Sequence, residues 1–333
     1  MKTFFKPPAS QLFIIAAAAF LLTSCLSDSV TDPDPPEQNG PEYPTPTESV
    51  APDGVLEAVT WNLERYGEDI YGSERGIQRT KNILRIADSL QADLYGLQEV
   101  TGQQGLDSLS KYMTGYRGFV AEHISYNQKL AFLYNTNTID SLSSGAIITG
   151  QEDEEYYWAG RLPLYFSFNY NYQETSTPIY AIVIHAKANP LSGSAGEREE
   201  AYNRRVRAAE SLFTYLQNEK PDAHIILLGD YNDDVDVSIY DDTSPSPYED
   251  FVMAENSFRA VTESISEANQ SSYIAGNFTD LIDHIMISDE LFGNYTSSSE
   301  EIYFEAENFI EDYEETTSDH LPVWAKFDLS ASN

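Results

Sequence analysis

Short apolar runs alternate with amphipathic stretches along most of the chain. Segments 73–90 and 197–218 carry apolar residues near helical spacing and are predicted to form the two main helices. The apolar runs predicted to be strands are 55–61, 93–97, 130–134, 146–149, 164–168, 178–184, 225–228, 281–287 and 323–327. Many strands with two substantial helices predict a layered α/β sandwich, in which two sheets pack face to face and helices cover their outer faces.

The first residues have the pattern of a secretion signal. Lys2 and Lys6 form a short positive segment before the apolar run 11–22, which is too short to span a bilayer comfortably. The run ends in the sequence LTSC at 22–25, which resembles a bacterial lipobox and implies that Cys25 is lipidated and begins the mature chain. A plain secretory signal is the alternative. The lipobox predicts an extracytoplasmic protein that is anchored by lipid to a bacterial membrane, at the outer membrane or the cell surface.

Residues 26–54 are rich in Pro and in acids and contain no Lys or Arg. Proline restricts the backbone and like charges repel, so this segment is predicted to be an extended, disordered tether. The predicted order is a signal peptide at 1–24, the lipidated Cys25 and its tether at 25–54, one domain at 55–329 and a short tail at 330–333.

The chain is strongly acidic: 54 Asp and Glu oppose 19 Lys and Arg among 333 residues, a formal net charge of −35. This charge argues against a general nucleic-acid-binding protein, which normally shows a basic surface, and against adhesion to anionic lipid. The hydrophobic share of 41% is too high for a disordered chain. A single Cys excludes an intramolecular disulfide framework and a zinc site built from several thiolates.

Polar side chains stand where the predicted strands begin or end. These short clusters are Trp61-Asn62, Gln98-Glu99, Gly229-Asp230-Tyr231-Asn232, Asp283-His284 and Ser318-Asp319-His320, and His185 directly follows the run 182–184. A carboxylate or imidazole at the rim of a core is partly desolvated, which is costly unless the group meets a metal ion or a partner. Together these hard oxygen and nitrogen ligands, with no thiol among them, favour a site for Mg²⁺ or Mn²⁺ that acts on phosphate.

The order and spacing of these clusters resemble the endonuclease/exonuclease/phosphatase superfamily, which has the DNase I-like fold. The resemblance extends from Leu56 to Phe327. The motifs that carry it are WN at 61–62, LQEV at 97–100, RLP at 161–163, VIH at 183–185, LGDYN at 228–232, IDHI at 282–285 and SDHLPV at 318–323. It implies a four-layered α/β sandwich, with two central, mostly antiparallel sheets flanked by helices. It also implies hydrolysis of a phosphate ester by metal-assisted, in-line attack of water.

The same resemblance implies a role for each motif residue. Glu99, Asn62 and Asp319 are implied to hold the divalent metal ion, which is Mg²⁺ or Mn²⁺, with Ca²⁺ as an alternative. His320 is implied to be the general base toward water or to hold the scissile phosphate, and Asp283 is implied to orient its imidazole.

Four further residues complete the implied set. Asp230 and Asn232 would position the nucleophile and stabilise charge on the phosphoryl oxygens, and both Asn232 and Arg161 would contact the phosphate. His185 would bind phosphate or donate a proton to the leaving group. In the DNase I subgroup this histidine pairs with a Glu, whereas the matching residue here is Gln128, which puts the acid role of the histidine in question. The choice between Asp230 and His320 as the base also stays open.

Three functions are compatible with the sequence. The favoured one is a membrane-tethered nuclease, with nucleic acid as its substrate and with the membrane contacted only through the lipid at Cys25. The second is a sphingomyelinase-like or inositol-phosphate phosphodiesterase or phosphatase. The third is a non-catalytic surface-binding lipoprotein. No protein partner is implied, and a monomer is expected.

Basic residues concentrate on the two predicted helices. Most of these arginines are expected to lie on the helix surface and to pair with acids three or four residues away. Arg65 and Arg75 follow the strand end at Asn62 and are placed to reach the cleft. The aromatic run 156–158 is expected either in the core or at a surface that stacks on a base.

Overall fold

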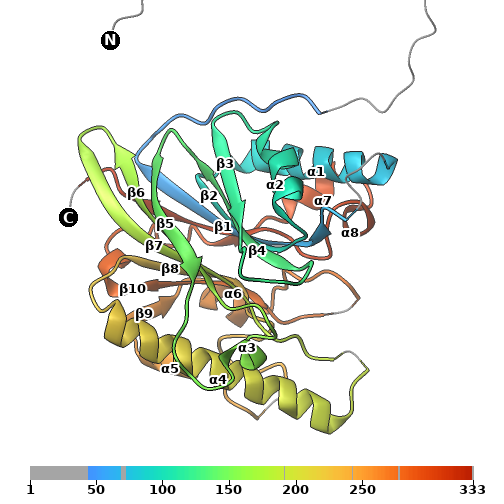
Figure 1. Cartoon of the computed structure of the whole chain (residues 1–333), viewed down its shortest axis with the longest axis vertical. Coiled ribbons are helices and arrows are strands. Elements are labelled where there is room, and N and C mark those ends of the chain that lie inside the picture. The colour runs from blue at the N-terminus through green and yellow to red at the C-terminus, as the bar shows by residue number, and fades with distance from the viewer. Residues whose placement is uncertain (1–43, 69–72, 191, 242, 277, 332–333) are drawn as a thin grey trace, which may run out of the picture. The chain divides into compact units, whose positions relative to one another are not determined.

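The computed structural model describes residues 44–331 except 69–72, 191, 242 and 277. The predicted signal peptide, the lipobox Cys25 and most of the predicted tether lie outside the described residues. The described part contains two six-stranded sheets that pack face to face between helices (Figure 1).

The first sheet has the strand order β11-β12-β1-β2-β4-β3 and the second has the order β5-β6-β7-β8-β10-β9. In the same order, the first six strands are Glu301–Ile302, Val323–Asp328, Val55–Tyr66, Leu94–Val100, Lys129–Asn135 and Tyr116–Val120. The second six are Ile139–Ala146, Leu164–Tyr172, Thr175–His185, Ile225–Asp230, Asp283–Ser288 and Phe258–Ala260. Among the described strand pairs only β1–β2 and β7–β8 are parallel, which confirms two mostly antiparallel sheets.

Helices cover the outer face of each sheet (Figure 1). The helices that pack on the first sheet are α1 (Glu74–Leu90), α2 (Gln103–Ser110), α6 (Glu263–Glu267), α7 (Glu305–Phe309) and α8 (Tyr313–Thr316). Those that pack on the second sheet are α3 (Glu154–Tyr157), α4 (Ala195–Glu219) and α5 (Glu249–Met253). A 3₁₀ turn, η1, is formed by Asp289–Leu291. The arrangement is the four-layered α/β sandwich that the sequence predicted.

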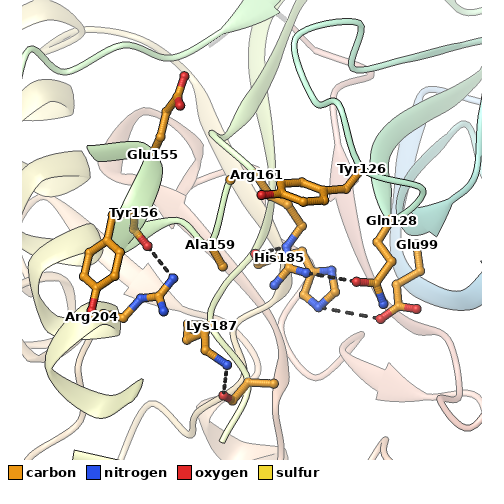
Figure 2. Close-up of a pocket in the computed structure, with 12 residues that line it drawn as sticks. Glu99, Tyr126, Gln128, Glu155, Tyr156, Ala159, Arg161, His185, Lys187 and Arg204 are labelled. Atoms are coloured by element: carbon orange, nitrogen blue, oxygen red, sulfur yellow. Dashed lines mark hydrogen bonds and ion pairs between the residues drawn. The ribbon is translucent and has the colours of Figure 1, made fainter. Parts of the chain in front are cut away.

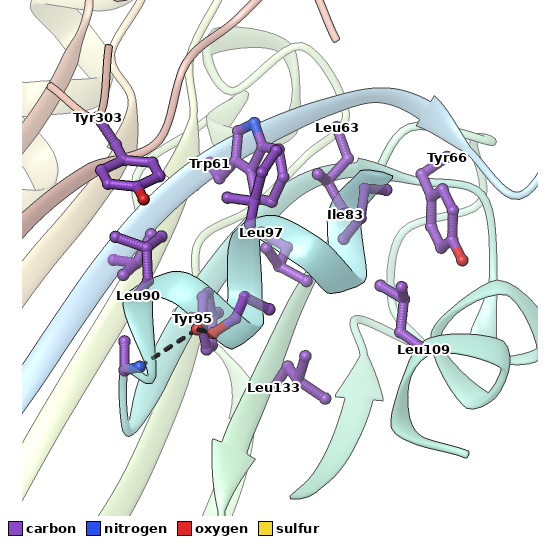
Figure 3. Packing of buried hydrophobic residues seen from close by; sticks show 14 of the residues in the cluster. Trp61, Leu63, Tyr66, Ile83, Leu90, Tyr95, Leu97, Leu109, Leu133 and Tyr303 are labelled. Atoms are coloured by element: carbon purple, nitrogen blue, oxygen red, sulfur yellow. Dashed lines mark hydrogen bonds between the residues drawn. The ribbon is translucent and has the colours of Figure 1, made fainter. Parts of the chain in front are cut away.

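Three apolar layers hold the sandwich together. Between the sheets, the rings of Phe132 and Phe166 lie with centroids 5.5 Å apart. Beneath α1, Ile83 shares a buried layer with Trp61 and Tyr95 of the first sheet (Figure 3). A third layer lies between α4 and the second sheet. Burial of this apolar surface is the main favourable term in folding. Because the buried layers are closely packed, they hold the polar strand ends on a rigid scaffold.

Both main helices begin at a serine. At α1, Ser73 Oγ accepts the N–H of Gly76 over 3.1 Å. At α4, Ser194 and Glu197 form a reciprocal capping box. These caps satisfy N–H groups that lack a partner within the helix, so each helix starts within two residues of its predicted position.

One predicted strand is wrong in position. The run 146–149 is predicted as a strand, but β5 ends at Ala146 and extends back to Ile139. Because β5 is an edge strand with most of its side chains exposed, polar residues such as Asp140 and Ser143 leave no apolar run to detect. The edge strand β3 of the first sheet, which is interrupted by Arg117, was missed for the same reason.

Residues 44–54, the described end of the predicted tether, contact the sandwich. Thr47 N donates to Tyr112 O over 2.7 Å, and Asn137 Nδ2 donates to Val50 O over 3.0 Å. The folded unit therefore includes contacts made before Val55. Within the described residues, no helix has both the length and the apolar character needed to cross a membrane.

Candidate active site

Strand register brings polar residues from both sheets together. Asp230 at the end of β8 lies opposite His185 on the parallel strand β7 and opposite Asp283 on the antiparallel strand β10. From the first sheet, Asn62 Nδ2 donates to Asp230 Oδ2 over 3.0 Å, so the two sheets meet at this carboxylate. The predicted clusters thus converge because β1, β7 and β8 end, and β10 begins, at the same end of the sandwich.

Gly229 permits the close approach of β8 to β7. Its φ is +153°, and a Cβ at this position would lie 2.2 Å from Ile184 O. Any other residue would therefore push the two strands apart and move the neighbouring Asp230 away from His185.

Asp230 is the buried centre of the site. Its Oδ2 lies 3.4 Å from His185 Nε2 and 4.0 Å from His320 Nε2, and its Oδ1 accepts the N–H of Asn232 over 2.9 Å. Burial and the nearby charge of Asp283 raise the pKa of Asp230 to about 7. A carboxyl group of this kind can exchange a proton near neutral pH.

His320 is oriented by a buried carboxylate. Its Nδ1 lies 2.7 Å from Asp283 Oδ2, and Ser272 Oγ donates to the same oxygen over 2.6 Å. Burial alone would lower the pKa of His320, but the charge and hydrogen bond of Asp283 raise it to about 10. This arrangement holds the ring in one orientation and turns Nε2 toward Asp230 and Asp319, whose Oδ1 is 3.9 Å away.

The backbone of His320 is fixed as firmly as its ring. Trp61 Nε1 and Tyr313 Oη both donate to His320 O, over 3.0 and 2.8 Å. Ser318 Oγ donates to Asn62 O over 2.6 Å, which ties the loop before β12 to the end of β1. The two motifs at 61–62 and 318–320 are thus one structural unit.

Carboxylates next to these groups form a candidate site for a hard cation. Glu99 Oε1 lies 3.9 Å from His185 Nε2, and Glu99 has a left-handed φ of 58°, a strained backbone that is common at functional sites. Burial raises the pKa of Asp319, and the charge of Glu99 adds to this rise. Burial raises the pKa of Glu64, and the charges of Asp319 and Glu99 add to it, so these three carboxylates repel one another.

The donor set fits the divalent ion that the sequence predicts. Asp230, Asp283 and His320 each offer a ligand atom within 4.8 Å of the others, and Asp283 Oδ1 is buried without a hydrogen-bond partner among the described residues. The predicted ligands Glu99, Asn62 and Asp319 are not members of this group, so their role as ligands stays a prediction. Oxygen-rich, acidic and partly buried donors are typical of Mg²⁺ and Mn²⁺ sites. The predicted ligand Asn62 already accepts the N–H of Glu64 at Oδ1 over 2.9 Å, which leaves that oxygen one free lone pair.

His185 and Arg161 form the side of the site on the second sheet. Arg161 is buried, and its guanidinium donates to His185 O and Ala186 O over 3.2 and 2.9 Å and to Gln128 Oε1 over 3.3 Å. Gln128 therefore bonds Arg161 and not His185, whose Nδ1 is buried without a hydrogen-bond partner in the described part of the chain. Burial and the charge of Arg161 lower the pKa of His185 well below its usual value.

Asn232 is held beside this group. It has a left-handed φ of 51°, which Asn tolerates better than most residues, and its Nδ2 donates to Ala186 O over 3.2 Å. That bond leaves Asn232 Oδ1 available to accept a hydrogen bond from water or substrate. The predicted catalytic, metal-binding and phosphate-binding residues therefore lie at one end of the sandwich, in or next to the Asp230 cluster, whereas Cys25 lies outside the described residues.

Two helix arginines depart from the surface position that was expected for most of them. Arg204–Glu200 and Arg207–Glu210 are the expected helix-surface pairs, but Arg79 and Arg205 are buried. Both lie on the apolar stripe of their helices, three or four residues from buried apolar positions, and this spacing was the signal that could have placed them inside.

The buried arginines support the site from outside. Arg79 Nε donates to Thr317 O over 2.7 Å, next to the 318–320 motif. Arg205 pairs with Asp233 over 2.8 Å, next to Asn232. The sequence analysis did not single out Glu64 or Ser272, because neither directly follows or precedes an apolar run.

The sequence matches the Endonuclease/Exonuclease/phosphatase family over residues 59–320. The match extends over most of the 333 residues, so the chain belongs to this family, as the motifs predicted.

Solved structures have the same fold. A Danio rerio TDP2 complexed with a single-strand DNA product is 15% identical, with a TM-score of 0.57, and the alignment covers 83% of this chain and 99% of that one. The human Nocturnin catalytic domain with bound sulfate is 17% identical, with a TM-score of 0.55 and coverage of 84% and 96%. A mannosyl-6-phosphatase of Bacteroides thetaiotaomicron is 17% identical, with a TM-score of 0.52 and coverage of 81% and 98%. A comparison with curated proteins gave no match.

Proposed function

We propose that the chain is a divalent-metal-dependent phosphodiesterase, and that its substrate is nucleic acid. The observation that carries this proposal is the position of Asp230, between Asn62, His185 and the Asp283–His320 pair. Hydrolysis of a phosphodiester needs an activated water, neutralised phosphoryl oxygens and stabilisation of the departing oxygen; the cluster offers groups for the first two, and a bound divalent ion would supply the third.

The residues divide the work by their geometry. Asp230 and Asn232 hold and polarise the attacking water, since the carboxylate is buried and fixed by the Asn232 N–H. His320 presents Nε2 to the scissile phosphate, because Nδ1 is bonded to Asp283. His185 donates from Nε2 to a phosphoryl oxygen. Its partner in the family subgroup is replaced by Gln128, which bonds Arg161 instead, so we assign His185 to binding and not to acid catalysis.

Glu99 and Asp319 are the carboxylates that would hold the metal ion, with Glu64 close to them. A divalent cation there, when bound, neutralises charge on the nonbridging oxygens and polarises the leaving group. Arg161 adds a fixed positive charge on the other side of His185, held by two backbone carbonyls.

Nucleic acid is the substrate class we favour. A structural neighbour was solved with a single-strand DNA product, which supports this choice. The mannosyl-6-phosphatase neighbour makes a phosphomonoester the competing substrate.

A substrate panel tests the proposal. Plasmid DNA, RNA, sphingomyelin, inositol phosphates and mannose 6-phosphate are incubated with the purified chain in Mg²⁺ or Mn²⁺, at low and high salt. We expect cleavage of DNA or RNA, and we expect Asn232→Ala to abolish it. Turnover of the lipid or the monoesters without nucleic acid would overturn the substrate choice, and nuclease activity that survives Asn232→Ala would overturn the assignment of the site.

We also propose that the protein is an extracytoplasmic lipoprotein, anchored to a bacterial membrane at Cys25. The apolar run 11–22 and the sequence LTSC at 22–25 support this location. We expect Cys25→Ser to move the protein from the membrane fraction to the soluble fraction, because acyl chains supply the membrane affinity. Unchanged fractionation of this variant would count against lipidation.

A further inference from the structure

A cavity of about 520 Å³ adjoins the site and extends away from it. Glu99 and His185 line one end, so the cavity opens directly from the groups that face the scissile phosphate. In the view of Figure 2, Lys187 lies between this end and the pair formed by Tyr156 and Arg204. None of the roles described so far uses Lys187, Arg204 or the tyrosines at the rim.

The cavity concentrates positive charge in a very acidic protein. Three of the 12 residues that line it are basic (Arg161, Lys187 and Arg204) and two are acidic (Glu99 and Glu155), whereas the whole chain has 19 Lys and Arg against 54 Asp and Glu. Lys187 Nζ donates to Ala188 O over 3.0 Å, and it forms no ion pair within the described part of the chain. Burial and the charges of Arg204 and Arg161 lower the pKa of Lys187, so an anion at this point would relieve repulsion.

Arg204 is held in place at the far wall. Its guanidinium donates to Tyr156 O over 2.5 Å and lies 4.1 Å from the centroid of the Tyr156 ring. Glu200 Oε1 is 3.9 Å away and also accepts from Tyr156 Oη over 2.7 Å. The buried Nε of Arg204 has no hydrogen-bond partner among the described residues. This arginine is thus pre-positioned by an aromatic ring and a carbonyl, as arginines that bind phosphate often are.

Tyr126 adds an exposed aromatic face to the cavity. Its side chain packs on Gly160, where an added Cβ would lie 2.3 Å from Tyr126 Cε2. Tyr126 nevertheless stays 58% exposed, so much of its apolar ring is open to a ligand. Exposed aromatic rings beside basic groups stack on nucleobases in proteins that bind single strands.

We propose that Lys187 and Arg204 form a second phosphate subsite, and that Tyr126 stacks on the base between this subsite and the scissile phosphate. The substrate is therefore a nucleotide chain with a phosphate adjacent to the one that is cleaved, rather than an isolated diester or a sugar phosphate. This inference rests on the proposed function, because the subsite is defined relative to the cluster around Asp230.

Three thymidine dinucleotides test the subsite in the purified chain. TpT has one diester and no terminal phosphate, whereas pTpT and TpTp carry a further phosphate at one end. Chromatography of the products separates diester cleavage from loss of a terminal phosphate. We expect the wild type to cleave one of the two phosphorylated dinucleotides with a kcat/KM about tenfold above that for TpT, since one charge-assisted contact is worth about this much.

Variants assign this preference to named residues. Lys187→Met is expected to remove most of the preference, and Lys187→Arg to retain it, because only the charge is required. Lys111→Met is the matched control, since Lys111 follows α2 and does not line the cavity. Tyr126→Ala is expected to lower kcat/KM for all three dinucleotides alike, and no change in this variant would overturn the stacking assignment.

The outcomes separate the subsite from the proposed function. Bis(p-nitrophenyl) phosphate, which has one diester and no second phosphate, is assayed beside the dinucleotides. If it is cleaved but the three dinucleotides are treated alike, or if Lys187→Met keeps the preference, the subsite is overturned and the phosphodiesterase stands. If none of the four compounds is cleaved, the proposed function itself fails.

Discussion

His320→Ala is expected to lower kcat/KM for phosphodiester hydrolysis by about 10²- to 10³-fold, the range for loss of one pre-positioned donor that stabilises charge on the phosphoryl oxygens. His320 Nε2 faces Asp230, and its Nδ1 is fixed by Asp283 over 2.7 Å, so no other described side chain stands in the same place. The assay is the initial rate on bis(p-nitrophenyl) phosphate in saturating Mg²⁺.

Two further variants show whether that loss belongs to the site. His224→Ala removes an imidazole just before β8, at the opposite end of this strand from Asp230, and is expected to keep full activity. Asp283→Asn keeps the shape of the carboxylate but weakens its hold on the ring, and is expected to lower the rate toward that of His320→Ala. Circular dichroism and thermal unfolding check that each variant is folded. A His320→Ala enzyme with more than one tenth of wild-type activity would contradict the assigned role.

Glu99→Gln is expected to lower kcat/KM by about 10²- to 10³-fold, because loss of a charged metal ligand removes about 3 to 4 kcal/mol of transition-state stabilisation. The change keeps the side-chain shape and removes one negative charge next to Asp319 and Glu64. In the absence of metal the variant is expected to be at least as stable as the wild type, since the charge of Glu99 raises the pKa of both neighbours by repulsion.

Metal binding gives a readout that does not depend on activity. A ligand that binds only the folded state raises Tm, so Mg²⁺ is expected to raise the Tm of the wild type and to raise that of Glu99→Gln much less. Glu174→Gln is the matched control, because Glu174 is exposed in the turn between β6 and β7, away from the site. Equal Mg²⁺-induced shifts in wild type and Glu99→Gln would remove Glu99 from the ligand set.

The part of the site that consists of residues at strand ends was predictable from the sequence. The runs before His185 and Asp230 are continuous and apolar, because these strands are buried on both faces, whereas the run before Asn62 is interrupted by Glu57 and Thr60. Each run stops at the residue that enters the site. A parallel pair aligns the ends of β7 and β8, so His185 and Asp230 had to meet once both strands were placed in one sheet.

Features that depend on contacts between distant segments were not predictable in this way. Ser272, Lys187 and Arg204 lie in loops or on a helix whose local pattern gives no sign of what they face. The partner of Gln128 is another example, since its bond to Arg161 depends on how two loops meet. Edge strands were not predicted for a different physical reason. An edge strand with exposed side chains can be built from polar residues, so its sequence contains no apolar run.

The charge of −35 is distributed in a way that composition could not show. Glu64, Glu99, Asp319 and Asp230 place a small part of it at the site itself, where a divalent ion would offset some of their charge. The basic residues that remain are partly gathered in the adjoining cavity. An acidic protein can therefore present a local site for an anionic substrate.

The most direct test of the central claim is the rate of bis(p-nitrophenyl) phosphate hydrolysis by the wild-type chain after treatment with EDTA. We expect a rate at the level of the uncatalysed reaction, and we expect the enzymatic rate to return when Mg²⁺ or Mn²⁺ is added in excess of the chelator. A rate that is unaffected by EDTA, or that stays at background when either ion is restored, would contradict metal-dependent hydrolysis at this cluster.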